Sequence, residues 1–257
     1  MALIKNQKLF KNPCFLSRGY GGTLPGPALV NDYMNAAQTG DEPLLLARAA
    51  PTVIARDRVE GAKFCAAQGF DAIVLDDGMQ NPSLHKDITL MVIDGTAGFG
   101  NGKTIPAGPL REPLDSAFAR ADAFILIGKD ERGTVPALPP GKPLFTAHIK
   151  PMLPDEPTIS SPFLAFAGLG RPEKFYRMLV ALGADIKAWR PFPDHYAYTA
   201  DDIAKLALEA DNLGAALLTT EKDFMRIQHF PCAPRINTIG IELMFDDEAA
   251  LAGFLKR

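Results

Sequence analysis

The sequence is poor in cysteine and has no long uninterrupted apolar segment. Its three cysteines, Cys14, Cys65 and Cys232, are far apart and form no C-x-x-C pair. This argues against a disulfide framework or a zinc ribbon, and it predicts small packing residues in a reducing compartment. No apolar run approaches the roughly 18 residues that span a bilayer. Lysines interrupt the first fifteen residues, which therefore lack the apolar centre of a secretory signal, and we expect a cytosolic chain.

An excess of charge of one sign is also missing. The 27 lysines and arginines nearly balance the 30 aspartates and glutamates, so the net charge is −3. No global basic field therefore points to nucleic acid as a partner, and nothing in the composition indicates a protein partner. The 47% of hydrophobic residues is ordinary for a soluble globular protein, and 257 residues suffice for one large domain or two smaller ones.

Short apolar runs alternate with helical patterns, which is the rhythm of a parallel sheet covered by helices. Three of these runs show little alternation, so we expect strands that are buried on both faces. They are residues 72–75, 89–93 and 123–127. Further strands are expected at 163–167, 215–219 and 236–241, and helices at 57–68, 172–182 and 248–256.

One segment breaks this rhythm. Residues 149–162 contain four prolines and no helical period, which predicts a linker between two domains. We therefore expect an α/β core over residues 1–150 and a smaller lobe over residues 151–257.

The strongest local motif is FDAIVLDDG, residues 70–78, in which an apolar strand ends in two aspartates. P-loop NTPases place a carboxylate beside the nucleotide's Mg²⁺ in this way, and open α/β sheets bind ligands at the carboxyl ends of their strands. Asp76 and Asp77 are therefore candidate metal ligands. The alternative is that these residues simply begin a turn, for which Asp-Gly is well suited.

The stretch GFGNGKT, residues 98–104, imitates a phosphate-binding loop without being one. That loop requires glycine, four residues and then GK[ST], but the first position here is Ala97. Pro106, Gly108 and Pro109 follow at once and would break the helix that such a loop must open. We expect a turn-rich loop, and no other stretch of the 257 residues matches the pattern.

Two loops carry residues suited to phosphate chemistry. In PAGPLREP, residues 106–113, prolines stiffen a loop from which Arg111 would clamp phosphate and Glu112 would bind Mg²⁺. The alternative is a surface ion pair. In SRGYGG, residues 17–22, glycines allow close backbone approach to a ligand, with Arg18 and Tyr20 as anchors. A plain flexible turn explains this segment equally well.

Three further segments hold candidate polar groups. Asp41 and Glu42 of GDEP precede an apolar helix, where the helix dipole alone would favour acidic residues. His195 is the one histidine of four in an aromatic and acidic neighbourhood, FPDHYAY, although a lone histidine is more often structural. LLTTEKD, residues 217–223, either closes over a phosphate or is an ordinary helix N-cap region.

Taken in order, these motifs closely resemble the tetraacyldisaccharide 4′-kinase family of lipid A synthesis. The resemblance runs from about Phe15 to nearly the C-terminus through SRGYGG, GDEPLLLA, DDGMQNPSL, GFGNGKTIPAGPLREP, FPDHY and LLTTEKD. It implies a P-loop NTPase-like parallel sheet flanked by helices, a smaller C-terminal α/β lobe and a site in the cleft between them. It also implies an ATP- and Mg²⁺-dependent kinase, peripheral to the cytosolic face of the inner membrane. The substrate would be an acylated disaccharide 1-phosphate, whose 4′-hydroxyl is phosphorylated to give lipid IVA.

The resemblance also implies residue roles. Asp41 would be the catalytic base in a dyad with His195, because a sugar hydroxyl must lose its proton. Arg111 would neutralise charge on the phosphoryl group in transit. The remaining candidates are the metal ligands Asp76, Asp77 and Glu112 and the nucleotide or sugar-phosphate contacts Arg18, Tyr20 and Gln80.

The chain departs from the family pattern in two places. Asn81 stands where many members have a histidine, and the family's first strand and Walker A loop precede SRGYGG, whereas here only fourteen residues without glycine precede Phe15. We therefore expect a sheet without its first strand and phosphate loop, and Mg²⁺-ATP binding only by a chain extended upstream. The competing hypotheses are a non-catalytic remnant that binds the lipid disaccharide and a metal-dependent phosphohydrolase that uses His195.

Overall fold

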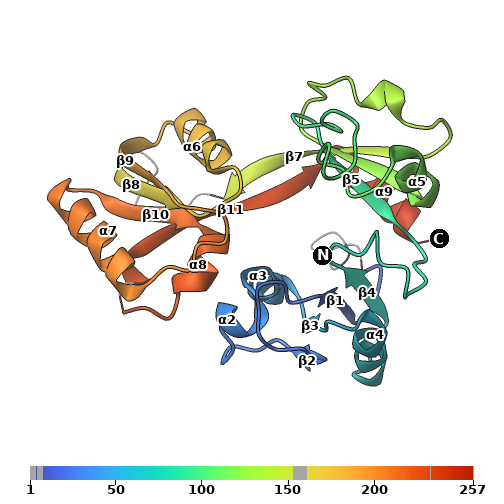
Figure 1. The fold of residues 1–257 in the computed structure, drawn as a ribbon, viewed down its shortest axis with the longest axis horizontal. Helices are drawn as coiled ribbons and strands as arrows, with labels where there is room; N and C mark the ends of the chain where they lie inside the picture. Colours follow the sequence, from blue (N-terminus) through green and yellow to red (C-terminus); the bar gives the residue numbers. More distant parts are fainter. Residues whose placement is uncertain (1–3, 5–7, 153–160, 232, 257) are drawn as a thin grey trace. The chain divides into compact units, whose positions relative to one another are not determined.

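A computed structural model of the chain describes residues 4, 8–152, 161–231 and 233–256. The described residues fall into two units (Figure 1). Unit 1 combines residues from 1–13, 66–150 and 242–257, and unit 2 combines residues from 14–65 and 151–241. One of the boundaries lies between Lys150 and Pro151, but residues 14–65 group with the later part of the chain.

Unit 2 is built on a parallel sheet that is covered by helices on both faces. The strand order is β11-β10-β8-β9, and all three neighbouring pairs are parallel. Figure 1 shows α6 and α7 on opposite sides of these strands. The elements are β8 (Pro162–Ala167), α6 (Pro172–Ala181), β9 (Asp185–Pro191), α7 (Ala200–Asn212), β10 (Ala216–Thr220) and β11 (Ile236–Phe245).

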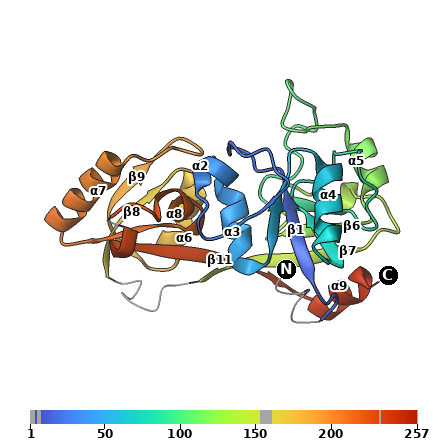
Figure 2. The same cartoon turned by 90° about the horizontal axis from the view of Figure 1, so that it is seen from below.

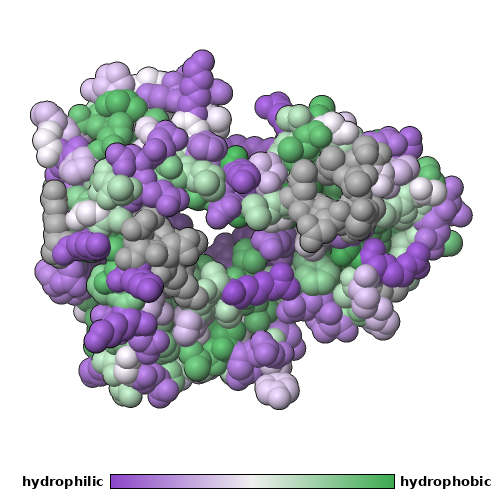
Figure 3. Space-filling view, turned by 180° about the vertical axis from the view of Figure 1, so that it is seen from behind, coloured by the Kyte–Doolittle hydropathy of each residue, from purple (hydrophilic) through white to green (hydrophobic). Residues whose placement is uncertain are grey.

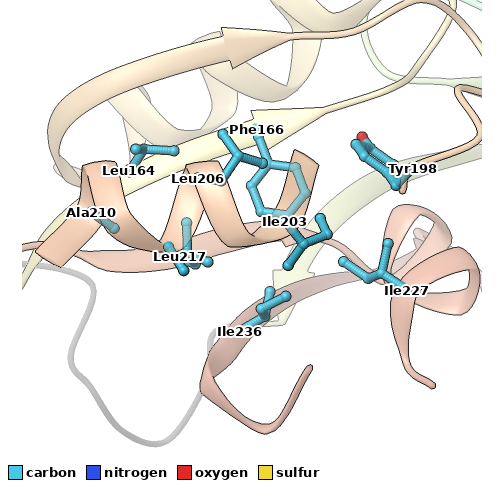
Figure 4. Close-up of a cluster of buried hydrophobic side chains, with 10 residues drawn as sticks. Leu164, Phe166, Tyr198, Ile203, Leu206, Ala210, Leu217, Ile227 and Ile236 are labelled. Carbon is cyan, nitrogen blue, oxygen red and sulfur yellow. The ribbon is translucent and has the colours of Figure 1, made fainter. Parts of the chain in front are cut away.

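Strand β8 explains why both faces need a helix. Successive side chains of a strand point to opposite faces. Leu164 and Phe166 pack into the cluster that contains Leu206 of α7 (Figure 4), whereas Phe163 packs with residues of α6 on the other face. Phe163 and Phe166 are both fully buried, and burial of such a side chain contributes about 1.5–3 kcal/mol. This double-sided core gives the carboxyl ends of β8 and β10 a rigid base.

The N-terminal part of unit 2 adds a small sheet and several helices. Strand β3 pairs in parallel with β1 and antiparallel with β2. Helix α3 packs against α8, with Leu44 and Met225 in one buried cluster (Figure 2). The elements are β1 (Pro13–Ser17), β2 (Ala28–Leu29), α2 (Ala36–Thr39), α3 (Asp41–Ala49), β3 (Thr52–Ile54) and α4 (Arg58–Ala67). Helix α8 (Glu221–Ile227) comes from the later part of the chain.

Unit 1 contains the strand order β5-β6-β7-β11, in which β5–β6 and β6–β7 are parallel. Its core packs Ile93, Phe124 and Leu126 with Phe118 of α5. Strands β7 and β11 are long, and each contributes residues to both units. The elements are β4 (Ala72–Leu75), β5 (Leu90–Asp94), α5 (Leu114–Arg120), β6 (Ala123–Ile127), β7 (Leu144–Met152) and α9 (Glu248–Leu255), with short 3₁₀ turns at Val135–Ala137 and, in unit 2, Ala233–Arg235.

The predicted alternation of strands and helices is confirmed, and the strands at residues 72–75 and 123–127 have the predicted bounds. Burial on both faces is confirmed for β6 but wrong for β4 and β5. Strand β5 lies at a sheet edge, where Ile93 faces the core and Val92 on the opposite face is 57% exposed. Ile73 of β4 is exposed as well.

The predicted linker is partly wrong. Residues 149–152 continue β7, and β8 begins at Pro162. Proline is tolerated within a strand where its missing N–H is not needed, so Pro151 does not end β7. Residues 153–160 of the same segment lie outside the described residues. Strand β11 also runs to Phe245, beyond the predicted end at residue 241.

The surface and the cysteines fit the composition. Hydrophilic and hydrophobic residues are interspersed over the face shown in Figure 3. Cys14 and Cys65 are buried and free, as predicted for packing residues, and Cys232 lies outside the described residues. Among the helices of the described ranges, none has the length and apolar character to cross a membrane.

Candidate active site

The first candidate group lies in unit 2, where helix α3 begins. Gly40 precedes the helix with a φ of +88°, and a Cβ at this position would come within 2.3 Å of the Tyr20 carbonyl oxygen. Only glycine accommodates both this backbone conformation and this close approach. The loop that carries Tyr20 therefore lies directly against the start of α3, whose first residue is Asp41.

Asp41 is a buried carboxylate in a tight ion pair. Its side chain is 5% exposed, and its Oδ2 accepts a hydrogen bond of 2.7 Å from Arg226 Nε and another from Arg226 Nη2. Burial by itself raises the pKa of Asp41, but the hydrogen bonds and charge of Arg226, with smaller contributions from Lys222 and His195, hold that pKa below its ordinary value. Asp41 is therefore an ionised acceptor in the folded protein.

Arg226 is in turn held by Asp223, both on helix α8. Its Nη1 donates to Asp223 Oδ1 at 2.9 Å and to the Gly168 carbonyl oxygen at 3.1 Å. Asp223 is fully buried and also accepts hydrogen bonds from Gly168 N at 3.0 Å, Tyr198 Oη at 3.1 Å and Thr220 Oγ1 at 2.7 Å. Burial and the charge of Asp223 raise the pKa of Tyr198. Asp223 is thus fully hydrogen-bonded and holds the Arg226 guanidinium in place.

Thr220 explains why α8 starts where it does. Its Oγ1 accepts from Asp223 N at 3.0 Å, which is an N-cap hydrogen bond, so the N-cap interpretation of LLTTEKD is confirmed. The segment nevertheless does more than cap a helix. Lys222 Nζ lies 2.8 Å from Glu42 Oε1 on α3, so α8 joins α3 through two ion pairs, one exposed and one buried.

His195 reaches the same carboxylate from the loop after β9. Its Nδ1 lies 3.2 Å from Asp41 Oδ2 and 3.4 Å from Arg226 Nη2, and its ring meets the Tyr20 ring edge-on at a centroid distance of 5.9 Å. The backbone of His195 has a φ of +53°, which is uncommon for a residue other than glycine and is typical of functional sites. A proton on Nδ1 can be donated to Asp41, which leaves Nε2 as an acceptor.

The second candidate group lies in unit 1 and joins the loop after β4 to the loop between β5 and α5. Arg111 Nη1 lies 2.6 Å from both carboxylate oxygens of Asp77, and this ion pair raises the pKa of Arg111. Asp77, like His195, has a positive φ, of 49°. Glu112 accepts a hydrogen bond of 2.9 Å from Gln80 Nε2 and pairs with Arg120.

The oxygen donors of this second group suit Mg²⁺, which favours carboxylates and keeps several ligand positions for water and phosphate. Asp76 and Asp77 follow β4 directly, Asp76 half-buried and Asp77 exposed. In the described part of the chain, no three acidic, histidine or cysteine side chains gather closely enough to hold a metal ion alone. One or two carboxylates with nucleotide phosphates would complete such a site, so the residues fit the group.

The structure therefore places the predicted residues in two sets. Unit 2 brings Asp41, His195 and Tyr20 together. Arg18, which precedes Tyr20 in the same loop, is exposed. Unit 1 brings together the pairs Asp77–Arg111 and Gln80–Glu112. The GKT stretch forms turns and no helix, as predicted.

Sequence reasoning missed Arg226 and Asp223. Their spacing of three residues on a helix indicates an ion pair, but it does not distinguish a buried pair from a surface one.

The family model described as tetraacyldisaccharide-1-P 4′-kinase matches residues 2–257. The chain belongs to this family.

Curated members of the tetraacyldisaccharide 4′-kinase family show the same extent of likeness. The chain is 48% identical to the tetraacyldisaccharide 4′-kinase of Methylobacterium nodulans over 249 residues, which are 93% of this chain and 72% of that protein. It is 45% identical to that of Rhodospirillum rubrum, over 95% of this chain and 75% of that protein. The crystal structure of LpxK from Aquifex aeolicus in complex with ATP superposes with a TM-score of 0.74 at 27% identity, covering 98% of this chain and 79% of that one. The predicted α/β fold is thereby confirmed.

Proposed function

We propose that this chain transfers the γ-phosphate of ATP to the 4′-hydroxyl of a tetraacyldisaccharide 1-phosphate, forming lipid IVA, and that the 257 residues alone do so with impaired activity because they contain no phosphate loop. The observation that carries the proposal is the 3.2 Å approach of His195 Nδ1 to the buried carboxylate of Asp41, in a chain of the tetraacyldisaccharide 4′-kinase family. Sugar phosphorylation requires that a hydroxyl lose its proton, and a coupled carboxylate and imidazole provide the acceptor. Because the substrate carries four acyl chains, we place the reaction at the cytosolic face of the inner membrane.

In this proposal Asp41 and His195 act as one proton-accepting pair. The carboxylate holds the imidazole in place, and the pair takes the proton of the 4′-hydroxyl as its oxygen bonds to the γ-phosphorus. The bond between the γ-phosphorus and the β–γ bridging oxygen breaks, and ADP leaves. Tyr20, which is 72% exposed beside the His195 ring, contacts the sugar phosphate, and Arg18 in the same loop supplies a positive charge to it.

The second set of residues serves the nucleotide. Asp76 and Asp77 would hold Mg²⁺, with Glu112 and Gln80 beside them, and the ion when bound neutralises charge on the phosphates. Arg111 now pairs with Asp77 through an exposed contact. Exchange of this partner for phosphate oxygens would place the guanidinium where it stabilises charge on the phosphoryl group.

The test is direct product detection. The purified chain would be incubated with Mg²⁺-ATP and the tetraacyldisaccharide 1-phosphate in detergent micelles, and the gain of one phosphoryl group followed by mass spectrometry. D41N and H195Q should each lower kcat by about 10²–10⁴-fold, the range for loss of general base catalysis. R235M, which removes an exposed ion pair with Asp211 elsewhere in unit 2, is the matched control. Absence of product even at enzyme concentrations and reaction times far above those at which the Rhodospirillum rubrum enzyme forms it would reject the proposal.

One observation favours a second candidate function. The 257 residues contain no GxxxxGK[ST] segment, the element that supplies backbone N–H groups and a lysine to nucleotide phosphates. A non-catalytic module that binds the acylated disaccharide would explain this. The same assay separates the two, because such a module retains the labelled disaccharide in a binding measurement and yields no phosphorylated product.

A further inference from the structure

A single guanidinium connects two buried carboxylates next to the Asp41–His195 pair. Arg226 donates to Asp41 through Nε and Nη2 and to Asp223 through Nη1, and its side chain is only 8% exposed. The planar fork of arginine fixes the angles between these donors, so the position of one acceptor determines the position of the other. Asp223 therefore sets where Asp41 lies.

We propose that Arg226, anchored by Asp223, is a positioning residue that fixes the Asp41 carboxylate against the His195 imidazole for the phosphoryl transfer. The inference rests on the proposed function for its catalytic consequence, but its structural content stands on the contacts in unit 2 alone. Arg226 touches both members of the pair, since Nη2 also lies 3.4 Å from His195 Nδ1.

Asp223 holds Arg226 through a dense set of hydrogen bonds. Asp223 accepts from one backbone N–H, two hydroxyls and the guanidinium, so a shift of Arg226 would break several hydrogen bonds together. An arginine that merely neutralised Asp41 could lie on the surface and needs no second buried carboxylate, whose desolvation is costly. The burial of Asp223 is explained if its carboxylate orients the Arg226 guanidinium toward Asp41.

The charged groups around Asp41 give the proposal a measurable signature. Arg226 and Lys222 on α8, His195 on the loop after β9 and Glu42 on α3 itself face or flank the carboxylate. Burial raises the pKa of Asp41, and Arg226 is the strongest group that lowers it. Removal of Arg226 takes away both its hydrogen bonds and its charge, so it should raise the pKa of Asp41, whereas lysine at this position keeps the charge without the fork.

The experiment titrates Asp41 in the full chain labelled with ¹³C at aspartate carboxyl carbons, with the Asp41 signal assigned by its loss in D41N. R226M is expected to raise the pKa of Asp41 above that of the wild type, R226K to restore part of the lowering, and R235M to leave it unchanged. In the phosphoryl-transfer assay R226M should lower kcat about 10²-fold, the order of loss from a misplaced catalytic group, with a smaller change in KM. R226K should recover part of that loss.

The titration and the activity assay together separate the positioning role from the proposed function. An Asp41 titration in R226M and R226K that matches the wild type overturns the proposal, whatever the activity. If R226M does not fold, R226K and D223N carry the same test, because the first keeps the charge without the fork and the second removes the anchor. A shifted titration without product from any variant, wild type included, retains the positioning role and rejects the proposed function. A shifted titration with unchanged kcat rejects the catalytic consequence.

Discussion

Each of the two candidate groups contains an arginine–carboxylate pair, and the two pairs have the same chemistry in opposite environments. In unit 2 the side chains of Arg226 and Asp41 are 8% and 5% exposed, whereas in unit 1 those of Arg111 and Asp77 are 58% and 60% exposed. Charges attract one another far more strongly in a protein interior than in water, but moving them there also costs more. A buried pair is therefore a fixed part of the framework, while an exposed pair can exchange partners.

This difference suits the roles that we propose. A proton acceptor must keep its geometry through every turnover, so the Asp41 group gains from burial. A phosphate-binding arginine and a metal-binding aspartate must release each other when a nucleotide arrives, so Arg111 and Asp77 gain from exposure. The comparison makes four predictions, ordered from the largest effect on the free energy of unfolding to the smallest.

The R226M substitution should lower the free energy of unfolding by about 3–5 kcal/mol, because it leaves Asp41 and Asp223 buried without their counter-charge. Urea unfolding followed by fluorescence of Trp189, the one tryptophan of the chain, reports on unit 2. R235M, which removes an exposed pair of the same type in the same unit, should change the free energy of unfolding by less than about 1 kcal/mol. Equal losses of unfolding free energy in R226M and R235M would contradict the contrast between the buried and the exposed pair.

Acidification should destabilise the wild type more than D41N. The pKa of Asp41 is lowered in the folded state, so its ionised form contributes stability that is present above the unfolded value of about 3.9. That contribution is lost as the pH falls from there toward the lower folded pKa. Urea midpoints measured from pH 7 to pH 2.5 should show a shallower decline in D41N, and parallel declines would refute this linkage.

The T220A substitution should cost about 0.5–2 kcal/mol, because it removes the N-cap of α8 and one of the hydrogen bonds to Asp223. T220S retains the hydroxyl and serves as the control, with a near-wild-type thermal midpoint expected by circular dichroism. If T220S lost as much stability as T220A, the effect would belong to the methyl group of Thr220 and not to its hydroxyl.

The R111M substitution should change the free energy of unfolding by less than about 0.5 kcal/mol, because it breaks an exposed pair. Denaturation followed by circular dichroism measures it, and the same variant should lose most phosphoryl transfer. A stability loss above about 2 kcal/mol would show that the Arg111–Asp77 pair is part of the framework after all.

Much of the scaffold follows from local sequence. The apolar runs at residues 72–75 and 123–127 specify strands because their branched residues favour a sheet, and Thr220 predicts a helix start through its side-chain oxygen. Pro151 misled the prediction, since strand β7 continues through it. Side-chain periodicity carries no information on whether a strand lies at a sheet edge, which is why the exposure of Val92 was not foreseen.

The candidate site residues are predictable only where they lie within a short sequence motif. Asp77 and Arg111 stand in short segments with recognisable chemistry, whereas Arg226 contacts Asp41 across 185 residues of sequence. No local sequence pattern predicts this contact, because the burial of Arg226 depends on how α3 and α8 pack. Only the chain's three-dimensional arrangement distinguishes Arg226 from a surface arginine.

That separation has a consequence for how the protein is made. Ribosomes add about 5–20 residues per second, so Asp41 is synthesised roughly 10–40 s before Arg226. During this interval the nascent chain carries a carboxylate whose burial has no compensating positive charge, which favours keeping the start of α3 in water. The final assembly of unit 2 must therefore wait for the translation of its last helix and strand.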